Sequence, residues 1–300
     1  MTATGGVPRV SVGLPVYNAE RYLPLAMDAL LAQTFGDFEL VVSDNGSTDG
    51  TEDICRAYAA TDDRVVYLRQ EQNRGGAWNH NLVAELARAP YFKWAADDDL
   101  HEPEHLARCV EVLDADQSVV LASTWVDFID EHGAPLGPHL VELYQTGSAH
   151  PHERFTELAV AWHGCFDQYG VVRTAALRST PMLRRYAGSD RALLAELALY
   201  GRFHRVPEHL FHHPEHTGRS LTANPSRAQL AAWWAPDRPR RFVAPNAELL
   251  ADHVASVARS PLPPGERLRC YAGLVAWLRR HWRSLGSDAR YNLRRLAAAG

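Results

Sequence analysis

The sequence predicts an α/β fold in which helices cover both faces of a mainly parallel sheet. Between Val10 and about Asp130, short apolar runs alternate with segments whose apolar residues recur at helical spacing. Those helical segments have the length of the crossovers that join parallel strands. Apolar residues make up 46% of the 300 residues and charged residues 22%, which is typical of a protein that buries a core. One α/β core with a smaller appended region fits this length.

The first two strands are predicted from β-branched and apolar runs. Arg9–Leu14 reads as a strand that Pro15 ends, and a leucine-rich helix follows it. Phe38–Ser43 is the second strand. Asp49 and Glu52 then have the spacing of a capping box, which predicts that a helix begins there.

The pattern continues through the next units. Val65–Leu68 and Tyr91–Ala95 are predicted strands, and Ala77–Leu86 is a predicted helix between them. Pro103 is expected in the first turn of the following helix. Val119–Ile129 is another β-branched run.

Beyond about residue 140 the pattern is looser. A clear helix is predicted at Asp190–Tyr200, followed by a short strand pair at Phe203–Val206 and His209–His212. The proline- and arginine-rich stretch Pro236–Pro245 predicts a soft boundary before a mostly helical C-terminal segment.

Composition excludes several classes of protein. A net charge of -5 argues against a general nucleic-acid binder. The four cysteines are far apart and form no CxxC pair, which predicts reduced thiols in a cytoplasmic protein. The N-terminus lacks the pattern of a signal peptide, and no run approaches the roughly 18 apolar residues that span a bilayer. The oligomeric state is not predicted.

A polar loop follows each of the first four predicted strands. In open α/β sheets, ligands bind beyond the carboxyl ends of the strands, so we expect these loops to converge on one site. The loops are Pro15–Glu20 (PVYNAE), Ser43–Asp49 (SDNGSTD), Gln72–Asn79 (QNRGGAWN) and Ala96–Leu100 (ADDDL).

These loops suit a nucleotide sugar. A carboxylate such as Asp44 can accept hydrogen bonds from a base or ribose, and the ring of Tyr17 can pack on a base. Arg74 can neutralise a phosphate, which Gly75 and Gly76 would let the backbone approach closely.

Asp97, Asp98 and Asp99 follow one another at a strand end. Three adjacent carboxylates repel unless a cation or hydrogen-bond donors offset their charge. A divalent ion that bridges them to a diphosphate would do so, and it would stabilise the departing phosphate.

Four segments of the chain resemble the family 2 glycosyltransferases: SVGLPVYNAERYL, VVSDNGSTDGT, KWAADDDLHEPEHL and GSDRALLAELALYGRFHRVPEHLFHHPEHTGRS. The resemblance implies a GT-A fold with a nucleotide-sugar-binding half at 1–130, an acceptor-binding half at 131–235 and a helical extension at 236–300. It also implies transfer of a sugar, most readily from a UDP-sugar, to an acceptor hydroxyl.

The resemblance implies roles for individual residues. Asp99, Asp97 and His216 would bind Mn²⁺ or Mg²⁺. Ala96 stands where many members carry a first aspartate, so which of the aspartates ligate the metal stays open. The donor would be contacted by Pro15, Tyr17, Glu20, Asp44, Arg74 and Asp98.

Asp190 matches the catalytic base of the family, although Ser189 precedes it where a glutamate is common. It would deprotonate the acceptor in a single displacement with inversion. His163, Asp167 and Gln168 could line the acceptor pocket. A saccharide, a glycolipid and a small molecule all remain open as acceptors.

Each of these roles has a structural alternative. Asp98 and Asp99 could cap the helix near Pro103, and Asp44 could only form a turn. Asp190 could serve only as a helix cap. His216 and Arg74 could be solvated surface residues, and Trp233 and Trp234 could pack in a core or stack on a sugar.

The C-terminal segment Arg267–Arg295 contains eight arginines together with Trp277, Trp282 and Tyr291. A basic amphipathic helix of this kind can lie on an anionic membrane and make peripheral contact with it. Alternatively, the helix packs its apolar face on the catalytic domain.

Two rival functions fit part of the pattern. A nucleotidyltransferase of related fold would carry a glycine-rich basic loop directly after the first strand, where PVYNAE stands instead. A catalytically inactive protein that binds a nucleotide sugar would not need the aspartates that this chain retains.

Overall fold

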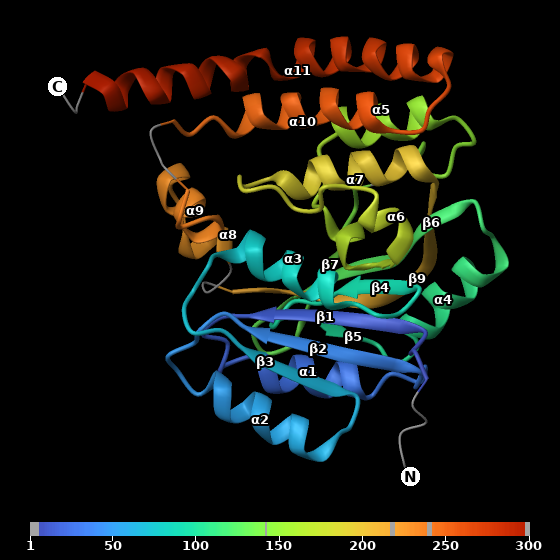
Figure 1. The fold of residues 1–300 in the computed structure, drawn as a ribbon, viewed down its shortest axis with the longest axis vertical. Coiled ribbons are helices and arrows are strands. Elements are labelled where there is room, and N and C mark those ends of the chain that lie inside the picture. Colours follow the sequence, from blue (N-terminus) through green and yellow to red (C-terminus); the bar gives the residue numbers. More distant parts are fainter. Residues whose placement is uncertain (1–5, 142, 217–219, 239–241, 298–300) are drawn as a thin grey trace.

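The computed structural model describes residues 6–141, 143–216, 220–238 and 242–297 (Figure 1). Within these residues one nine-stranded sheet has the order β3-β2-β1-β4-β8-β6-β9-β5, and β7 pairs with β6. The strands are β1 (Val10–Val16), β2 (Phe38–Asp44), β3 (Val65–Arg69), β4 (Tyr91–Trp94), β5 (Leu100–His101), β6 (Val119–Asp130), β7 (Pro135–Pro138), β8 (Val171–Arg173) and β9 (Arg202–Glu215).

The sheet has a parallel half and a mixed half. Strand β1 runs parallel to both β2 and β4, and β2 runs parallel to β3. Strand β8 is antiparallel to β4 and β6, whereas β6 and β9 are parallel. The predicted α/β fold with a mainly parallel sheet is therefore confirmed.

Helices cover both faces of the sheet. On one face α1 and α2 share a core with β1 and β2, and α4 extends this core against β6, β8 and β9. On the other face α3, α5, α7, α10 and α11 share a second core, and they are stacked in layers above the sheet in Figure 1. The helices are α1 (Leu23–Leu31), α2 (Thr51–Thr61), α3 (Gly76–Leu86), α4 (His105–Ala115), α5 (Pro151–Val160), η1 (Phe166–Tyr169), α6 (Thr174–Arg178), α7 (Ser189–Tyr200), α8 (Ser220–Ala223), α9 (Arg227–Trp234), α10 (Pro245–Arg259) and α11 (Pro264–Ala297).

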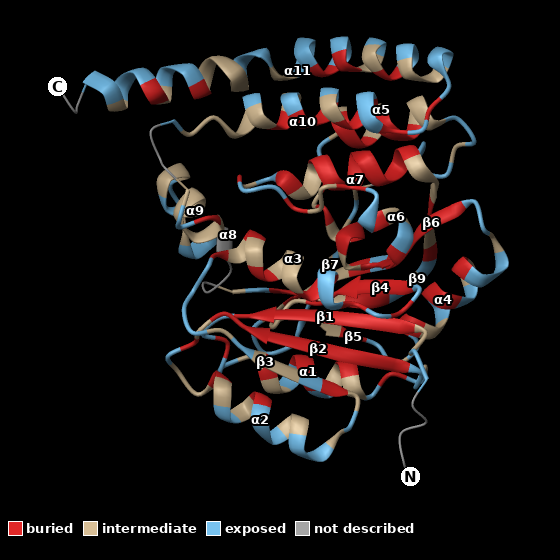
Figure 2. Ribbon diagram, viewed as in Figure 1, coloured by how far each residue is buried: buried red, intermediate tan, exposed pale blue. Residues whose placement is uncertain are grey.

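Burial follows these two cores. The strands β1 and β2 are buried along their whole length, and α7 is buried on nearly every side (Figure 2). Helix α7 has this burial because α5, α10 and the sheet enclose it. All four cysteines are buried and form no disulfide, as their spacing predicts.

Two predicted element ends are wrong. Pro15 does not end the first strand, because β1 continues through it to Val16. Since β1 pairs with β4 only as far as Gly13, the missing N–H of Pro15 lies on an unpaired side and costs no ladder bond. Pro103 lies two residues before α4 and not in its first turn.

The capping box also does not form. Helix α2 begins at Thr51, its cap residue is Gly50, and no side chain caps it. Glu52 instead pairs with Arg69 at 2.7 Å, and Asp49 accepts from the Thr51 hydroxyl at 2.6 Å.

The predicted strand pair around Val206 and His209 is a single long strand, β9. Its register against β6 shifts between these two residues. Pro207 and Glu208 form the extra residues of a bulge, so the proline bends the strand without ending it.

None of the described helices combines the length and the apolar content needed to cross a membrane.

Candidate functional site

The loops after β1 and β2 are tied together beside the sheet. The backbone N–H of Asn18 donates to Oγ of Ser47 at 2.9 Å, and the N–H of Gly50 donates to Oε2 of Glu20 at 2.7 Å. Asn18 has a φ of 50°, a left-handed conformation that asparagine tolerates. The first two polar loops therefore converge as predicted.

Three of the residues predicted to contact the nucleotide sugar lie in the first loop, and their exposure to solvent differs. Pro15 is buried within β1. Tyr17 is 38% exposed at the rim of the loop, so its ring is accessible to a base. Glu20 is exposed, but one of its carboxylate oxygens already accepts from Gly50.

Asp44 ends β2 and is fully buried. Its Oδ1 accepts from the N–H of Ser47 at 2.8 Å, and its Oδ2 accepts from the hydroxyl of Tyr67 at 3.0 Å. The Nε atom of Arg69 lies 3.6 Å from Oδ2. In this arrangement Asp44 holds the turn after β2, and a nucleoside could reach it only by replacing one of these partners.

The third loop joins the second through asparagine side chains. Nδ2 of Asn45 donates to Oδ1 of Asn73 at 3.0 Å, and the N–H of Arg74 donates to Oδ1 of Asn45 at 3.0 Å. The guanidinium of Arg74 lies 4.0 Å from the ring centroid of Trp78. Arg74 is exposed, and no described carboxylate pairs with it, so its charge is available to an anion.

Gly75 and Gly76 do not leave the open space that we predicted for a phosphate. A Cβ atom at Gly75 would lie 2.7 Å from the carbonyl oxygen of Trp234, and one at Gly76 would lie 3.2 Å from the ring of Trp233. Helix α9 thus packs directly on Gly75 and Gly76. The space that the missing side chains leave is filled by α9.

The strand-end aspartates form a concentrated negative charge. Burial raises the pKa of Asp97 well above its usual range, and the neighbouring charge of Asp98 raises it further. Burial and then Asp99 raise the pKa of Asp98. Carboxylates that resist ionisation together would ionise readily beside a cation.

Two histidines from the end of β9 reach these aspartates. Nδ1 of His213 lies 2.6 Å from Oδ1 of Asp99, and both side chains are almost fully buried. Nε2 of His216 lies 3.0 Å from Oδ2 of Asp98, and the His216 ring packs 4.3 Å from that of Tyr22. The predicted association of His216 with the aspartates is therefore present, whereas Thr217 to Arg219 of the same predicted loop lie outside the described residues.

The site has features that suit a divalent ion. Oδ2 of Asp99 and Nε2 of His213 are buried, and neither has a hydrogen-bond partner in the described structure. No three His, Cys, Asp or Glu side chains meet as a metal cluster within the described ranges. Since Mg²⁺ and similar ions take many of their ligands from water and substrate phosphates, one or two of these carboxylates would be sufficient protein ligands.

Asp190 lies in the first turn of α7, where the helix dipole favours a carboxylate. It is partly exposed, and its Oδ1 accepts from the N–H of Arg191 at 2.8 Å. Burial and then the nearby Asp190 raise the pKa of the Cys165 thiol. Asp190 therefore lies beside the loop that precedes η1.

Tyr169 connects Asp190 with the strand-end aspartates. Burial raises the pKa of its phenol, and the charges of Asp99, Asp98, Asp190 and Asp97 all raise it further. Asp190 and the three strand-end aspartates therefore all lie within electrostatic range of one phenol.

Lys93 was missed by the sequence predictions. It is the single lysine of the chain, and it is fully buried in β4 below the aspartates. Its ammonium donates to the backbone carbonyl of Tyr169. Burial lowers the pKa of Lys93 to about 8, against the opposing effects of Cys109 and Asp99. The rarity of lysine in this sequence was the signal that could have identified it.

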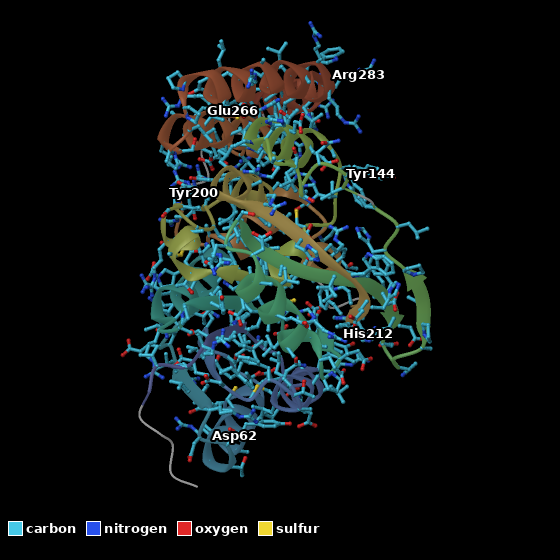
Figure 3. All side chains as sticks on the ribbon, turned by 90° about the vertical axis from the view of Figure 1, so that its right-hand side faces the viewer. Asp62, Tyr144, Tyr200, His212, Glu266 and Arg283 are labelled. Atoms are coloured by element: carbon cyan, nitrogen blue, oxygen red, sulfur yellow. The ribbon has the colours of Figure 1, made fainter. Side chains whose placement is uncertain are left out.

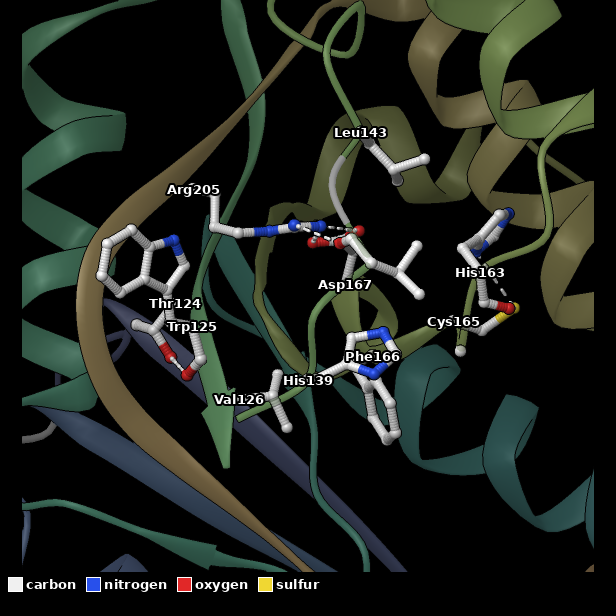
Figure 4. A pocket seen from close by; sticks show the side chains of 12 residues that line it. Thr124, Trp125, Val126, His139, Leu143, His163, Cys165, Phe166, Asp167 and Arg205 are labelled. Carbon is white, nitrogen blue, oxygen red and sulfur yellow. Dashed lines mark hydrogen bonds and ion pairs between the residues drawn. The ribbon is translucent and has the colours of Figure 1, made fainter. Parts of the chain in front are cut away.

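A small cavity of about 20 Å³ is lined by two of the predicted acceptor residues, His163 and Asp167 (Figure 4). Burial would raise the pKa of Asp167, but Arg205 at 2.9 Å and Ser123 at 2.6 Å hold it below its usual value. Gln168 is buried beside the pocket but does not line it.

The walls of this pocket are partly aromatic. Trp125, which is 43% exposed, His139 and Phe166 line it. The rings of His139 and Phe166 are in edge contact, with centroids 4.8 Å apart. The cavity has room for a water molecule and not for a sugar ring.

The sequence profile of the Glycosyl transferase family 2 matches residues 11–167, just over half of the 300 residues. An uncharacterized glycosyltransferase of Methanocaldococcus jannaschii is 31% identical over 46% of this chain and 48% of its own length. The putative teichuronic acid biosynthesis glycosyltransferase TuaG of Bacillus subtilis is 31% identical over 44% of this chain and 52% of its own. The chain thus spans about half the length of these relatives.

Solved structures share the GT-A fold. TarS of S. aureus, in complex with UDP-GlcNAc, matches with a TM-score of 0.62 at 17% identity, over 90% of this chain and 72% of its own. The mannosyltransferase PcManGT of Pyrobaculum calidifontis, in complex with GDP-Man and Mn²⁺, matches with a TM-score of 0.55 at 22% identity, over 99% of this chain and 77% of its own.

Proposed function

The chain belongs to the Glycosyl transferase family 2, and from this premise we propose that it transfers a sugar with inversion from a UDP-sugar or a related nucleotide sugar to an acceptor hydroxyl. The observation that carries the proposal is that Asp190 and the three strand-end aspartates all raise the pKa of one phenol, that of Tyr169. Such a site combines a base for the acceptor with a binding place for a charged diphosphate.

The donor would bind across the first three loops. Tyr17 offers an accessible ring to the base, and Arg74 offers an unpaired guanidinium to the diphosphate. Glu20 and Asp44 hold the loops after β1 and β2 in place. They would therefore help to bind the nucleotide sugar by fixing the conformation of these loops. Pro15 acts in the same way from within β1.

Asp97, Asp99 and His216 would hold Mn²⁺ or Mg²⁺, and Asp98 would lie toward the donor. When bound, the ion would supply Lewis-acid stabilisation of the charge on the leaving diphosphate. The raised pKa values of Asp97 and Asp98 and the unpartnered Oδ2 of Asp99 support a cation at this place.

Asp190 would accept the proton of the acceptor hydroxyl as that oxygen attacks the anomeric carbon. The bond from the acceptor oxygen to the sugar forms as the bond to the diphosphate breaks. The acceptor, whether a saccharide, a glycolipid or a smaller hydroxyl compound, would lie beside the side chains of His163 and Asp167.

The test separates donor binding from turnover. In Asp190→Asn, we expect turnover to fall by about 10²-fold to 10⁴-fold while the affinity for the nucleotide stays unchanged. In Asp99→Asn, we expect the Mn²⁺-dependent part of UDP binding, measured by titration calorimetry, to be lost. The exposed Asp63→Asn serves as the matched control. Unchanged turnover in both Asp190→Asn and Asp99→Asn would contradict the roles proposed for these two aspartates.

A further inference from the structure

Helix α11 has two long sides with different surroundings. Its inner side buries Cys270, Leu274 and Trp277 against the second core. No helix or strand among the described residues covers its outer side, and α11 forms one end of the molecule in Figure 1. At about 1.5 Å per residue, its 34 residues give a rod of about 50 Å.

The outer side carries a continuous apolar stripe. Large apolar side chains recur there at intervals that keep them on one line of the helix surface. Their exposed fractions range from 41% at Leu278 to 71% at Leu268, and Trp282 is 61% exposed. The stripe consists of Leu268, Val275, Leu278, Trp282, Leu293 and Leu296.

Arginines line one flank of this apolar stripe. At 3.6 residues per turn they occupy the neighbouring arc of the same helix. Glu266 is bound by His152 at 2.8 Å, and Asp288 is buried and bound by Arg227 at 2.9 Å, so the outer side presents no exposed carboxylate. The exposed arginines are Arg269, Arg279, Arg280, Arg283, Arg290 and Arg294.

Most of these arginines have no acidic partner. Arg269 pairs with Glu266 at 2.6 Å, whereas the other five make no ion pair within the described ranges. Arg283 lies at the outer surface of α11, at the opposite end of the molecule from Asp62 (Figure 3). The guanidinium of Arg283 lies 5.3 Å from the ring centroid of Trp282, so an aromatic anchor and a cation are side by side.

We propose that the outer side of α11 docks on an anionic lipid bilayer, with the apolar stripe in the headgroup boundary and the arginines on lipid phosphates. Leucine and tryptophan enter this boundary from an amphipathic helix, and arginine heads stay at the level of the phosphates. The arginines without acidic partners favour an anionic surface over a second copy, because an antiparallel isologous contact would bring them against each other. The inference does not depend on the transferase reaction.

The carboxyl ends of β1 and β2 and the C-terminal half of α11 lie on the same side of the molecule in Figure 1. The outer side of α11 faces away from the sheet, with α10, α5 and α7 between them, so the docked bilayer would lie at the other end of the molecule from the sheet.

Vesicle flotation tests this inference with the full chain. We expect binding to vesicles of phosphatidylcholine mixed with phosphatidylglycerol, no binding to phosphatidylcholine alone, and release by salt. Arg279→Gln with Arg283→Gln should weaken binding about fivefold per arginine, and Trp282→Ser should weaken it by about tenfold. Leu25→Ser, at an apolar residue that is 58% exposed on α1, is the matched control and should bind as the unchanged chain does.

The readouts also test the alternatives. Thermal unfolding and UDP binding should be unchanged in every variant, which shows that the fold and the donor site are intact. Equal binding to both kinds of vesicle, or equal binding by all variants, would overturn the proposal. Dimers in sedimentation that Trp282→Ser dissociates, without any vesicle binding, would also overturn it.

Discussion

His253 on α10 is fully buried between Phe155 and Trp277, and neither ring nitrogen has a hydrogen-bond partner in the described structure. Burial lowers its pKa to about 3, with smaller effects from Arg191 and other cations. The unfolded chain therefore binds one more proton at this residue between about pH 6.5 and pH 3. Across that window the free energy of unfolding should fall with decreasing pH.

The substitution His253→Phe removes the imidazole that takes up this proton in the unfolded chain. We expect the loss of stability between pH 7 and pH 4 to become smaller by up to about 1.4 kcal/mol per pH unit. The loss should not vanish, because burial also lowers the pKa of His101 and His105. Urea unfolding at several pH values measures the slope, and the exposed His132→Gln should leave it unchanged. An unchanged slope in His253→Phe would contradict the neutral, buried state.

The sequence predicts the three aspartates of the site and, through the family resemblance, His216, but it does not predict His213. Asp97, Asp98 and Asp99 are adjacent in sequence, so any strand that ends before them presents them together. His213 contacts Asp99 because β5 pairs with β9, and in this pairing Leu100 lies opposite His212. Such a contact between residues far apart in sequence depends on the strand register, which local patterns do not determine.

At the scale of elements, α9 closes over the turn that begins α3, and Gly75 makes this possible. Gly75 has a φ of 92°, and a Cβ there would lie 2.4 Å from Cδ of Pro236. Gly133 has a φ of 84°, but a Cβ there would meet nothing within 4 Å. An alanine at either position would therefore have a strained backbone, but only an alanine at Gly75 would also clash with neighbouring atoms.

This difference gives a matched pair of variants. Gly133→Ala should cost about 1 kcal/mol of stability from the left-handed φ alone. Gly75→Ala should cost more and should also weaken nucleotide binding, because displacing α9 disturbs the loop that carries Arg74. Thermal unfolding and calorimetric titration with UDP measure both effects. Equal behaviour of the two variants would show that α9 does not support the loop.

The parallel half of the sheet could be predicted because each strand there is short, apolar and followed by its own helix. The second half could not be predicted as well, since β9 contains a proline that reads as a break. In the fold β6 provides a partner along nearly all of β9, and a bulge accommodates Pro207. Tertiary pairing thus overrides the local signal.

At the scale of the whole molecule, the C-terminal helices belong to the same core as the sheet. Leu249 of α10 and Trp277 of α11 lie in one cluster with Phe155 of α5 and Phe92 of β4. The predicted soft boundary at Pro236–Pro245, of which residues 239–241 are not described, therefore does not separate two cores. Sequence could not show which side of α11 is buried, because both sides are apolar.

Substitutions of Trp277 and Trp282 test whether α11 belongs to the same core as the sheet. Trp277 is fully buried, and Trp282 is 61% exposed on the same helix. Trp277→Ala should destabilise the molecule by about 3–5 kcal/mol and lower its Tm by roughly 10 °C. Trp282→Ala should change stability by less than about 0.5 kcal/mol.

The form of the transition matters as much as its midpoint. If α10 and α11 unfold together with the sheet, then Trp277→Ala shifts one calorimetric transition as a whole, and UDP protects the variant over that same transition. If the C-terminal helices formed an independent unit, Trp277→Ala would instead split off an early transition that UDP does not shift. The continuous core from β4 through α5 and α10 to α11 requires the first result.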